Sequence, residues 1–357
     1  MKLISLLGII LLTVAFVQSG IVRRDTDTDT DDFDDEDDSE EVVWDEDTWY
    51  EEDEDGNLVE ITDELGSNET LEETELLLPE KVFFHLYTLD NPSSSQEIYI
   101  GDDETLDSSN WNSSKLTRII THGWVNSKNS EACTLIRDAY LSEGDYNIIV
   151  VDWSKISKQL YGFARRRVYM VGGYVAKLID YLETKGMDVS ELIVIGHSLG
   201  GHIAGLTALQ ATNTVGYVIA LDPALPYFWF SSSGSRVAKG DAAYVQVIHT
   251  NGGLLGIDDA IGDIDFYPNG GSSQNGCIVD AAGSCSHARA YKYMAESITS
   301  DVGFWGRLCK SWRRFRYGRC SSTTTTYMGG STPTTETDSG SYYLRTARSS
   351  AYALGEI

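Results

Sequence analysis

The chain has 357 residues and a formal net charge of −28, because 55 acidic residues outnumber 27 basic ones. This length suits one large α/β domain with an appended segment and a sizeable core. Residues 25–75 hold 27 acidic residues and no Lys or Arg, so residues 76–357 carry a formal charge of only −4. Nucleic acid is therefore not an expected partner, because the folded part is mildly acidic and the acidic segment would repel phosphates.

The first 19 residues, MKLISLLGIILLTVAFVQS, begin with Lys2, continue as a short apolar stretch and end in small residues. This pattern predicts a secretory signal peptide over 1–19, cleaved near Ser19–Gly20, and hence a secreted, extracellular protein. An uncleaved membrane anchor is the alternative.

Residues 20–77 are predicted to be an acidic disordered segment, because they cannot bury enough apolar surface to offset self-repulsion and chain entropy. Two roles are open. The segment is either a solubilising tail or a pro-segment that docks on the catalytic domain through its aromatic side chains, Phe33, Trp44, Trp49 and Tyr50. The basic stretch GRLCKSWRRFRYGR, residues 306–319, is the candidate docking site for its acids.

Five cysteines in a secreted chain favour disulfides. Cys277 and Cys285 enclose seven residues, and Cys309 and Cys320 enclose ten, so two short loops are the economical pairing. Cys133 is left over and is expected to be a small buried apolar side chain.

Residues 78–357 are predicted to form one catalytic domain of the α/β class. The runs YNIIVVDW, LIVIGHS and VGYVIALDP lack polar alternation, which is typical of strands buried on both faces of a parallel sheet. Between the first two runs, apolar residues recur at helical spacing and predict a crossover helix, as a doubly wound sheet requires: Val168, Val171, Val175, Leu178, Ile179 and Leu182.

Ser198 lies in VIGHSLGGH, between an apolar strand and a helical pattern. This G-x-S-x-G arrangement is the nucleophile elbow of α/β-hydrolases. Gly196 and Gly200 are needed because a sharp strand-to-helix turn presses the flanking backbones against the serine. The turn also places Ser198 at a helix N-terminus, which favours developing negative charge.

A serine nucleophile needs a general base, and the base needs a carboxylate; in this fold they follow the serine as acid and then histidine. Asp222, at the end of the next predicted strand, is the candidate acid. Both His249, in VQVIHT, and His287, in CSHARAYKYM, follow it, and spacing alone leaves both open.

The ordered motifs FHLYTLDNP, TRIITHGW, YNIIVVDW, GHSLGGH, ALDPALP, DFYPNGG and CSHARAYKYMAESI resemble the pancreatic lipase family over most of residues 81–357. The resemblance implies an α/β-hydrolase fold with a mostly parallel sheet flanked by helices. It also implies that Ser198, Asp222 and His287 form the catalytic triad and that His249 is structural. The backbone N–H groups of Trp124 and Leu199 are the implied oxyanion-hole donors.

The same resemblance implies a carboxylic ester hydrolase that releases fatty acids from glycerolipids at a lipid–water interface, without metal or cofactor. Within the family, the loop between the cysteines before the triad histidine acts as a lid. Here it has only the seven residues 278–284, and a second covering loop is also short, so the chain looks similar to the arthropod phospholipase A1 branch. Triacylglycerol or galactolipid hydrolysis is the alternative, and a catalytically silent lipid-binding or yolk-type protein is the alternative of another class.

The resemblance also bears on partners and modification. No room is seen after the catalytic domain for the family's C-terminal PLAT β-sandwich, so a colipase partner is not expected. The triplets at Asn68 and Asn112 predict N-glycosylation sites. The aromatic run YFWF, Tyr227–Phe230, is either a hydrophobic wall for acyl chains or ordinary core packing.

Overall fold

The computed structural model describes residues 48–335 and 337–356. The predicted signal peptide and the acidic stretch up to residue 47 lie outside the described residues. Within the described residues, no helix combines the length and apolar character needed to cross a membrane.

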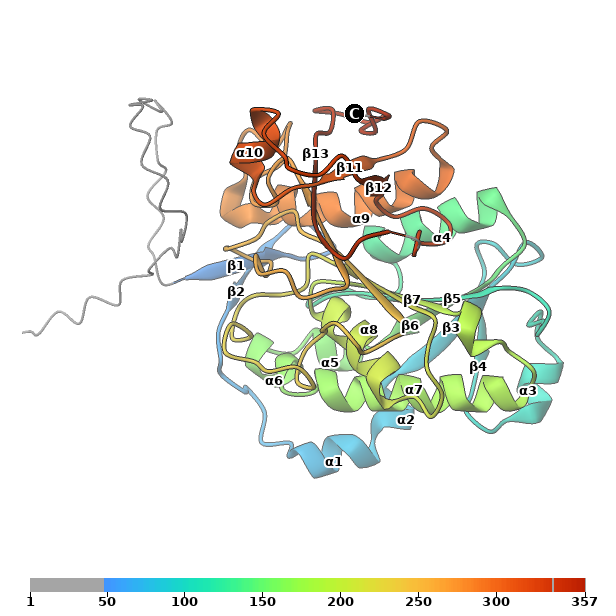
Figure 1. Ribbon diagram of the computed structural model, residues 1–357. Coiled ribbons are helices and arrows are strands. Elements are labelled where there is room, and N and C mark those ends of the chain that lie inside the picture. Colours follow the sequence, from blue (N-terminus) through green and yellow to red (C-terminus); the bar gives the residue numbers. More distant parts are fainter. Residues whose placement is uncertain (1–47, 336, 357) are drawn as a thin grey trace, which may run out of the picture. The chain divides into compact units, whose positions relative to one another are not determined.

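The centre of the described chain is a mixed sheet of eleven strands in the order β12-β11-β13-β10-β9-β8-β7-β5-β6-β3-β4 (Figure 1). Neighbours from β6 through β5, β7, β8, β9, β10 to β13 pair in parallel, and antiparallel strands complete both edges. The strands are β3 (Phe83–Tyr87), β4 (Gln96–Ile98), β5 (Thr117–Thr121), β6 (Asn147–Asp152), β7 (Ile193–His197), β8 (Tyr217–Leu221), β9 (Tyr244–Ile248), β10 (Ile264–Pro268), β11 (Trp305–Leu308), β12 (Thr325–Tyr327) and β13 (Gly340–Leu344). This is the predicted α/β-hydrolase fold.

Helices cover both faces of the sheet. Figure 1 shows α7 (Val168–Thr184) and α8 (Leu199–Gln210) on one side and α4 (Glu131–Glu143) and α9 (Ser284–Thr299) on the other. The predicted crossover helix is α7, and all six of its predicted apolar residues are buried. The shorter elements of the domain are α2 (Leu78–Lys81), α3 (Asp103–Asp107), α5 (Ser154–Ser157), α6 (Tyr161–Arg165), η1 (Val189–Glu191), η2 (Ala281–Gly283) and α10 (Trp312–Arg316).

The cysteines pair as predicted, with disulfides between Cys277 and Cys285 and between Cys309 and Cys320. Cys133 lies buried in α4, in the core beneath α4 and α9. Burial raises the pKa of its thiol to about 12, so it is an inert thiol at neutral pH.

Residues 48–77 differ from the prediction of disorder. They form an antiparallel hairpin, β1 (Trp49–Glu52) with β2 (Leu58–Ile61), and then α1 (Leu71–Leu76), drawn in blue in Figure 1. A capping box starts α1, because the Thr70 side chain accepts from the Glu73 N–H and the Glu73 carboxylate accepts from the Thr70 N–H. The prediction failed because the acids of this segment have basic partners on the domain, which a count of local charge does not include.

The main attachment of this segment is Arg167, whose side chain is only 2% exposed. Its guanidinium donates to the Thr74 hydroxyl at 2.7 Å, to the Glu69 carbonyl at 2.6 Å and to the Phe163 carbonyl at 3.0 Å. One buried cation therefore satisfies acceptors from both the acidic segment and α6, which fixes residues 69–74 to the domain.

Replacing Arg167 by Met should lower the free energy of unfolding by about 3 kcal/mol, because three buried acceptors lose their donor. Urea unfolding of the full chain measures the loss. The matched control is Arg166→Met, which removes an exposed ion pair with Asp63 and should cost below about 1 kcal/mol. Equal losses in the two variants would contradict the role assigned to Arg167.

Candidate active site

Ser198 stands at the junction of β7 and α8 with a φ of 56° and a ψ of −124°, a strained conformation for a residue with a side chain. The positions before and after Ser198 in the motif have no space for a side chain, which is the predicted reason for the glycines there. A Cβ at Gly196 would lie 1.9 Å from the Gly200 carbonyl oxygen, and one at Gly200 would lie 2.5 Å from the His122 carbonyl oxygen. The backbone itself therefore presents the Ser198 hydroxyl at the carboxyl edge of the sheet.

The other two predicted catalytic residues meet beside it. Asp222 follows the carboxyl end of β8, and His287 lies in the first turn of α9. His287 Nδ1 donates to Asp222 Oδ2 at 2.6 Å. The second oxygen of Asp222 accepts from the N–H groups of Thr250 and Asn251 at 2.7 and 3.0 Å, so the carboxylate cannot rotate away. Ser198, Asp222 and His287 are all buried.

The electrostatics of His287 suit a base that gains a proton. Burial opposes its charge, but the hydrogen bond to Asp222 and the charges of Asp222, Glu51 and Asp280 outweigh burial, so the pKa of His287 is raised. Neighbouring His197 behaves in the opposite way. Burial and the charge of His287 hold its pKa well below the usual range, and its Nε2 donates to the His287 carbonyl at 3.1 Å. Neutral His197 thus supports the backbone of His287.

His249, the rival that spacing left open, has a different environment. Its Nδ1 donates to the Ile257 carbonyl at 2.6 Å and its Nε2 donates to Asp265 at 2.9 Å. Both nitrogens are therefore occupied by acceptors inside the core, and no ring nitrogen faces Ser198.

The two predicted oxyanion donors come from the loop after β5 and the first turn of α8. Within the described residues, the backbone N–H groups of Trp124 and Leu199 have no hydrogen-bond partner. The loop is held by His122, whose ring accepts from the Trp153 N–H at 3.2 Å, and by the Trp124 indole, which donates to the Gln159 carbonyl at 2.8 Å. Trp124 is buried, so its side chain positions the loop from within.

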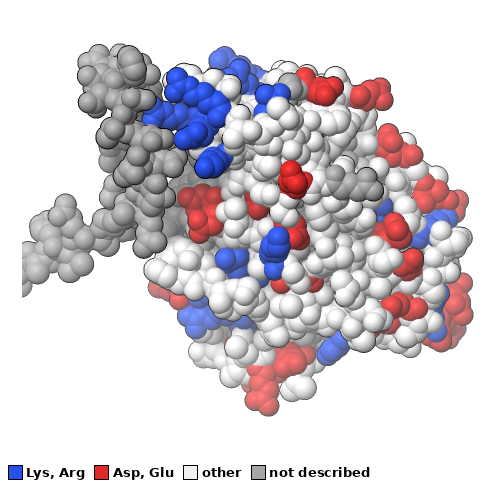
Figure 2. All heavy atoms as spheres, in the orientation of Figure 1, with Lys and Arg blue, Asp and Glu red and all other residues white. Residues whose placement is uncertain are grey.

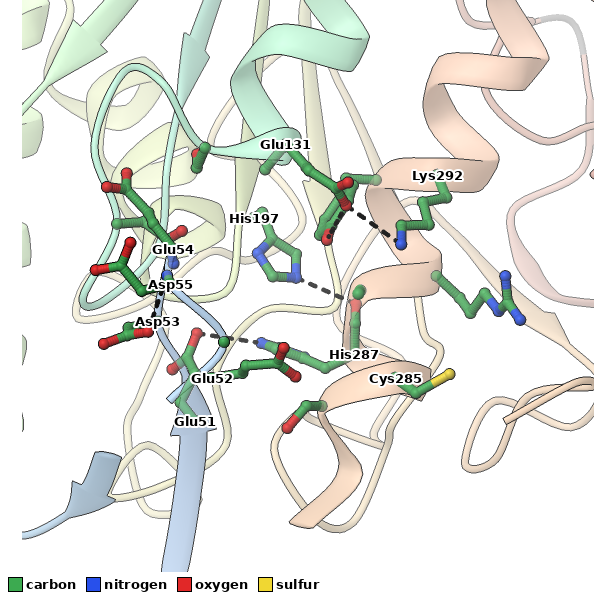
Figure 3. Close-up of a pocket in the computed structure, with 18 of the residues that line it drawn as sticks. Glu51, Glu52, Asp53, Glu54, Asp55, Glu131, His197, Cys285, His287 and Lys292 are labelled. Atoms are coloured by element: carbon green, nitrogen blue, oxygen red, sulfur yellow. Dashed lines mark hydrogen bonds and ion pairs between the residues drawn. The ribbon is translucent and has the colours of Figure 1, made fainter. Parts of the chain in front are cut away.

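Glu51 is the member of this site that the sequence did not single out. It projects from β1 toward His287, as Figure 3 shows, with Oε1 at 3.9 Å from His287 Nε2. Glu51 is only 5% exposed. In the described structure His287 Nε2 has no hydrogen-bond partner. Glu51 thus lies on the side of the imidazole where a proton would be exchanged with the serine.

Burial raises the pKa of Glu51 from 4.5 to about 7. The positive charge of His287 and a hydrogen bond from the Ser198 side chain lower this pKa, and the Asp222 carboxylate raises it. Nothing in the sequence separated Glu51 from the other acids. The one available signal was the set of aromatic residues in the acidic run, among them Trp49 and Tyr50, which left docking on the domain open as one of two roles.

The predicted docking site was the basic stretch 306–319, which includes α10. Figure 2 shows basic side chains gathered at the end of the molecule where α10 lies. Within residues 48–75, however, the ion pairs go elsewhere: Glu54 to Lys158, Asp63 to Arg165 and Arg166, and Glu69 to Lys81. The prediction is wrong for this part of the acidic segment because these cations lie closer along the path of the hairpin. The part up to residue 47 lies outside the described residues.

The aromatic run Tyr227–Phe230 was expected to be either a wall for acyl chains or ordinary core packing, and its residues differ in this respect. Phe228 is buried with its ring centroid 4.0 Å from that of His202. Trp229 and Phe230 are 41% and 92% exposed. The predicted lid loop is also apolar at its tip, since Ile278 and Val279 are 89% and 87% exposed. Apolar side chains from both loops therefore face solvent.

Beside the triad lies an open cavity of about 690 Å³, drawn in Figure 3. Its walls are the acidic turn after β1, the loop before α4 and the first turns of α9. Glu131 and Lys292 form an ion pair of 3.2 Å on one wall. The described residues contain no group of three or more His, Cys, Asp or Glu side chains that could hold a metal ion.

The sequence of the chain is similar to those of known proteins. Residues 54–352 match the family model described as Lipase. The chain is 37% identical over 269 residues to the pancreatic triacylglycerol lipase of Equus caballus, covering 68% of this chain and 58% of that protein. It is 34% identical over 267 residues to the inactive pancreatic lipase-related protein 1 of Homo sapiens, covering 68% and 57%. The chain thus spans a little over half the length of these relatives.

A solved structure of the Pyrobaculum calidifontis esterase aligns with a TM-score of 0.29 and 16% identity, covering 50% of this chain and 71% of that chain. This likeness is too low to carry an argument, so the assignment depends on the sequence matches. Because the family model covers most of the chain and relatives above 30% identity cover two thirds of it, the protein belongs to the lipase family.

Proposed function

We propose that this chain is a serine carboxylic ester hydrolase that releases fatty acids from glycerolipids, with Ser198, Asp222 and His287 as its triad. The observation that carries the proposal is the hydrogen bond of 2.6 Å between His287 and Asp222 beside a serine held at a φ of 56°. A structural serine has no need of a strained turn or of an oriented imidazole beside it.

The reaction is a two-step acyl transfer. His287 Nε2 removes the proton of Ser198 Oγ, and Oγ bonds to the ester carbonyl carbon. The oxyanion accepts hydrogen bonds from the free N–H groups of Trp124 and Leu199. Collapse of the intermediate expels the alcohol, which takes the proton from His287. Water then repeats the cycle, so a fatty acid leaves and the serine hydroxyl is restored.

The preferred substrate in this proposal is a phospholipid cleaved at sn-1, which makes the protein a phospholipase A1. The support is the small cover over the site. The lid loop between Cys277 and Cys285 contains only the three-residue turn η2, and we infer that a cover of this size admits a polar headgroup. Exposed Trp229, Phe230, Ile278 and Val279 offer apolar contacts to a lipid surface.

Secretion belongs to the same proposal, with two disulfides as support. The glycosylation candidates Asn68 and Asn112 are both exposed, which allows a glycan to be attached without disturbing the core. The proposed enzyme acts without a colipase.

A second candidate function is a catalytically silent lipid-binding protein on the same fold. The observation that favours it is the position of Glu51, because its carboxyl group lies 3.9 Å from His287 Nε2, which has no hydrogen-bond partner in the described structure. The two candidates differ in whether Ser198 reacts.

Purified full-length protein should release fatty acid from phosphatidylcholine faster than from emulsified triacylglycerol, and Ser198→Ala should abolish both activities. The physical reason is that the short cover admits the headgroup, while only Ser198 can form the acyl-enzyme. Fatty-acid titration on both substrates, with positional analysis of the lysophospholipid, measures this. Faster release from triacylglycerol would overturn the phospholipase A1 assignment, and undiminished release by Ser198→Ala would overturn the triad.

Gly256 offers a test of Asp222 that leaves the triad chemically intact. A Cβ at Gly256 would lie 2.3 Å from Asp222 Oδ1, so Gly256→Ala must displace the carboxylate that orients His287. We expect kcat to fall about 100-fold, the usual cost of a misplacement of about 1 Å in an active site. The assay is hydrolysis of a soluble ester such as p-nitrophenyl butyrate.

The matched control is Gly173→Ala in α7, where the new Cβ meets only the flexible end of the Gln210 side chain. This variant should keep full activity, since Ala is a better helix former than Gly. Wild-type activity in Gly256→Ala, with an unchanged unfolding midpoint, would show that Asp222 does not orient the base.

A further inference from the structure

We propose that strand β1, Trp49–Glu52, is an intramolecular inhibitor that occupies the substrate position of the active site, so that the described form is latent until this segment leaves. The inference rests on the proposed function, because a segment can inhibit only a site that reacts. It deepens that function by naming the ligand that the site holds in its resting state: an acidic, aromatic peptide segment of the same chain.

Glu51 takes the place of the reacting ester. An ester must bring its carbonyl carbon to Ser198 Oγ while His287 Nε2 lies close enough to move protons. The Glu51 carboxyl group lies beside both residues: its Oε1 is 3.9 Å from His287 Nε2, and the Ser198 hydroxyl is near enough to lower the Glu51 pKa. A carboxyl group is also what remains of an acyl chain after hydrolysis. Glu51 therefore resembles a product that has not left.

Trp49 covers the next part of the same site. Alternate residues of a strand share one face, so Trp49 and Glu51 point the same way. The Trp49 ring lies 6.0 Å from that of Tyr227 and 5.5 Å from that of Trp229, measured between centroids. These are the aromatic residues that follow Asp222 and are candidates for the acyl wall. The segment thus places an apolar group where an acyl chain would bind and a carboxyl group where its ester would react.

The family comparison separates β1 from the machinery of the domain. The match to the lipase family model begins at residue 54, after β1 has ended. The matched region therefore leaves out Trp49 and Glu51 and includes Ser198, Asp222 and His287. Glu51, which lies before the matched region, approaches His287 Nε2 to 3.9 Å, and this is the expected position of a regulatory segment.

The attachment of β1 is weaker than that of the residues after it. From Ile61 onward the segment is fixed by burial of Ile61, by the ion pairs of Asp63 and by the hydrogen bonds of Arg167. Strand β1, in contrast, pairs only with β2 among the described strands, and the exposed turn between them is tied to the domain by one surface ion pair, Glu54 with Lys158. An isolated two-stranded hairpin is only marginally stable in water. The geometry allows β1 to leave while the rest of the segment stays attached.

Departure of β1 should depend on pH. The titratable or hydroxyl groups that face Glu51, or act on it through His287, are His287 of α9, Asp222 after β8, Ser198 at the start of α8, Tyr161 of α6 and Asp280 before η2. Docked Glu51 has a pKa of about 7 against 4.5 in its free state, so docking takes up a proton. Docking is then strongest below the free value and weakens as the pH rises through 7, because the ionised carboxylate must be buried beside Asp222.

The experiment measures the rate at which a fluorophosphonate probe labels Ser198 in the full-length protein. In this reaction the serine oxygen displaces fluoride from phosphorus, so the rate reports access to the nucleophile. Glu51→Ala should raise the labelling rate and the hydrolysis of p-nitrophenyl butyrate about tenfold or more, because most wild-type molecules are blocked. Trp49→Ala should raise both rates in the same direction.

The matched control is Glu60→Ala, an exposed acid of the paired strand β2 that does not line the cavity beside the triad; this variant should label at the wild-type rate. Ser198→Ala should not label at all. Glu51→Gln keeps the size of the side chain but cannot ionise, so the wild-type rate relative to Glu51→Gln should rise as the pH passes 7. Unfolding midpoints of the variants confirm that each is folded.

The outcomes separate the two proposals. Rapid labelling of wild type, with no increase in Glu51→Ala or Trp49→Ala, would overturn the inhibitor and leave the hydrolase intact. Loss of labelling in Glu51→Ala, when wild type is labelled, would show that Glu51 supports the site and would also overturn it. No labelling in any folded variant would overturn the proposed function, and the inhibitor with it.

Discussion

The hydrogen bond between Asp222 and His287 is the contact on which the whole site depends, because it decides which imidazole nitrogen is left to face outward. Its two partners lie 65 residues apart in the sequence. Asp222 ends a central parallel strand, and His287 begins a helix that follows the β10 strand and the Cys277–Cys285 loop. Thr250 and Asn251 hold the far oxygen of Asp222 with backbone N–H groups. The free nitrogen of His287 therefore points in one direction, toward Ser198 and Glu51.

Because the free nitrogen of His287 points in one direction, a single carboxyl group from the N-terminal hairpin β1–β2 can affect the site. An imidazole with a carboxylate on each side is a different group from one that faces a hydroxyl, since the outer carboxylate competes for the proton that catalysis would use. Burying Glu51 beside His287 is unfavourable for its ionised form, and this is why its pKa is raised to about 7. The cost is offset by the packing of Trp49 against the aromatic residues that follow Asp222. The hairpin thus uses apolar contact to hold a polar group in an unfavourable position.

Much of this arrangement could be predicted from the sequence, because its determinants are local. Apolar runs identified the parallel strands, helical spacing identified α7, and the glycines around Ser198 identified the turn. The choice of His287 over His249 could not be made locally, since it depends on which histidine has both nitrogens engaged by acceptors from distant loops. Glu51 could not be identified from the sequence either, because its role also depends on residues distant in the chain. It is one acid among many in an acidic run, and only its three-dimensional neighbours distinguish it. The order of residues 48–77 escaped the sequence argument because its partners lie about a hundred positions away: Arg165 and Arg166 neutralise Asp63, and Arg167 binds the Glu69 carbonyl.

The disulfide between Cys277 and Cys285 has a consequence for how the base is held. Cys285 lies two residues before His287, in the same first turn of α9, so the bond that closes the lid loop also fixes the start of the helix that carries the base. With both thiols reduced, nothing covalent would hold that turn against the loop, and apolar Ile278 and Val279 would lie on an untethered strand of backbone. The cystine therefore adds a covalent tie to the hydrogen bonds that already place the imidazole, and the lid loop and the helix that carries the base share one anchor.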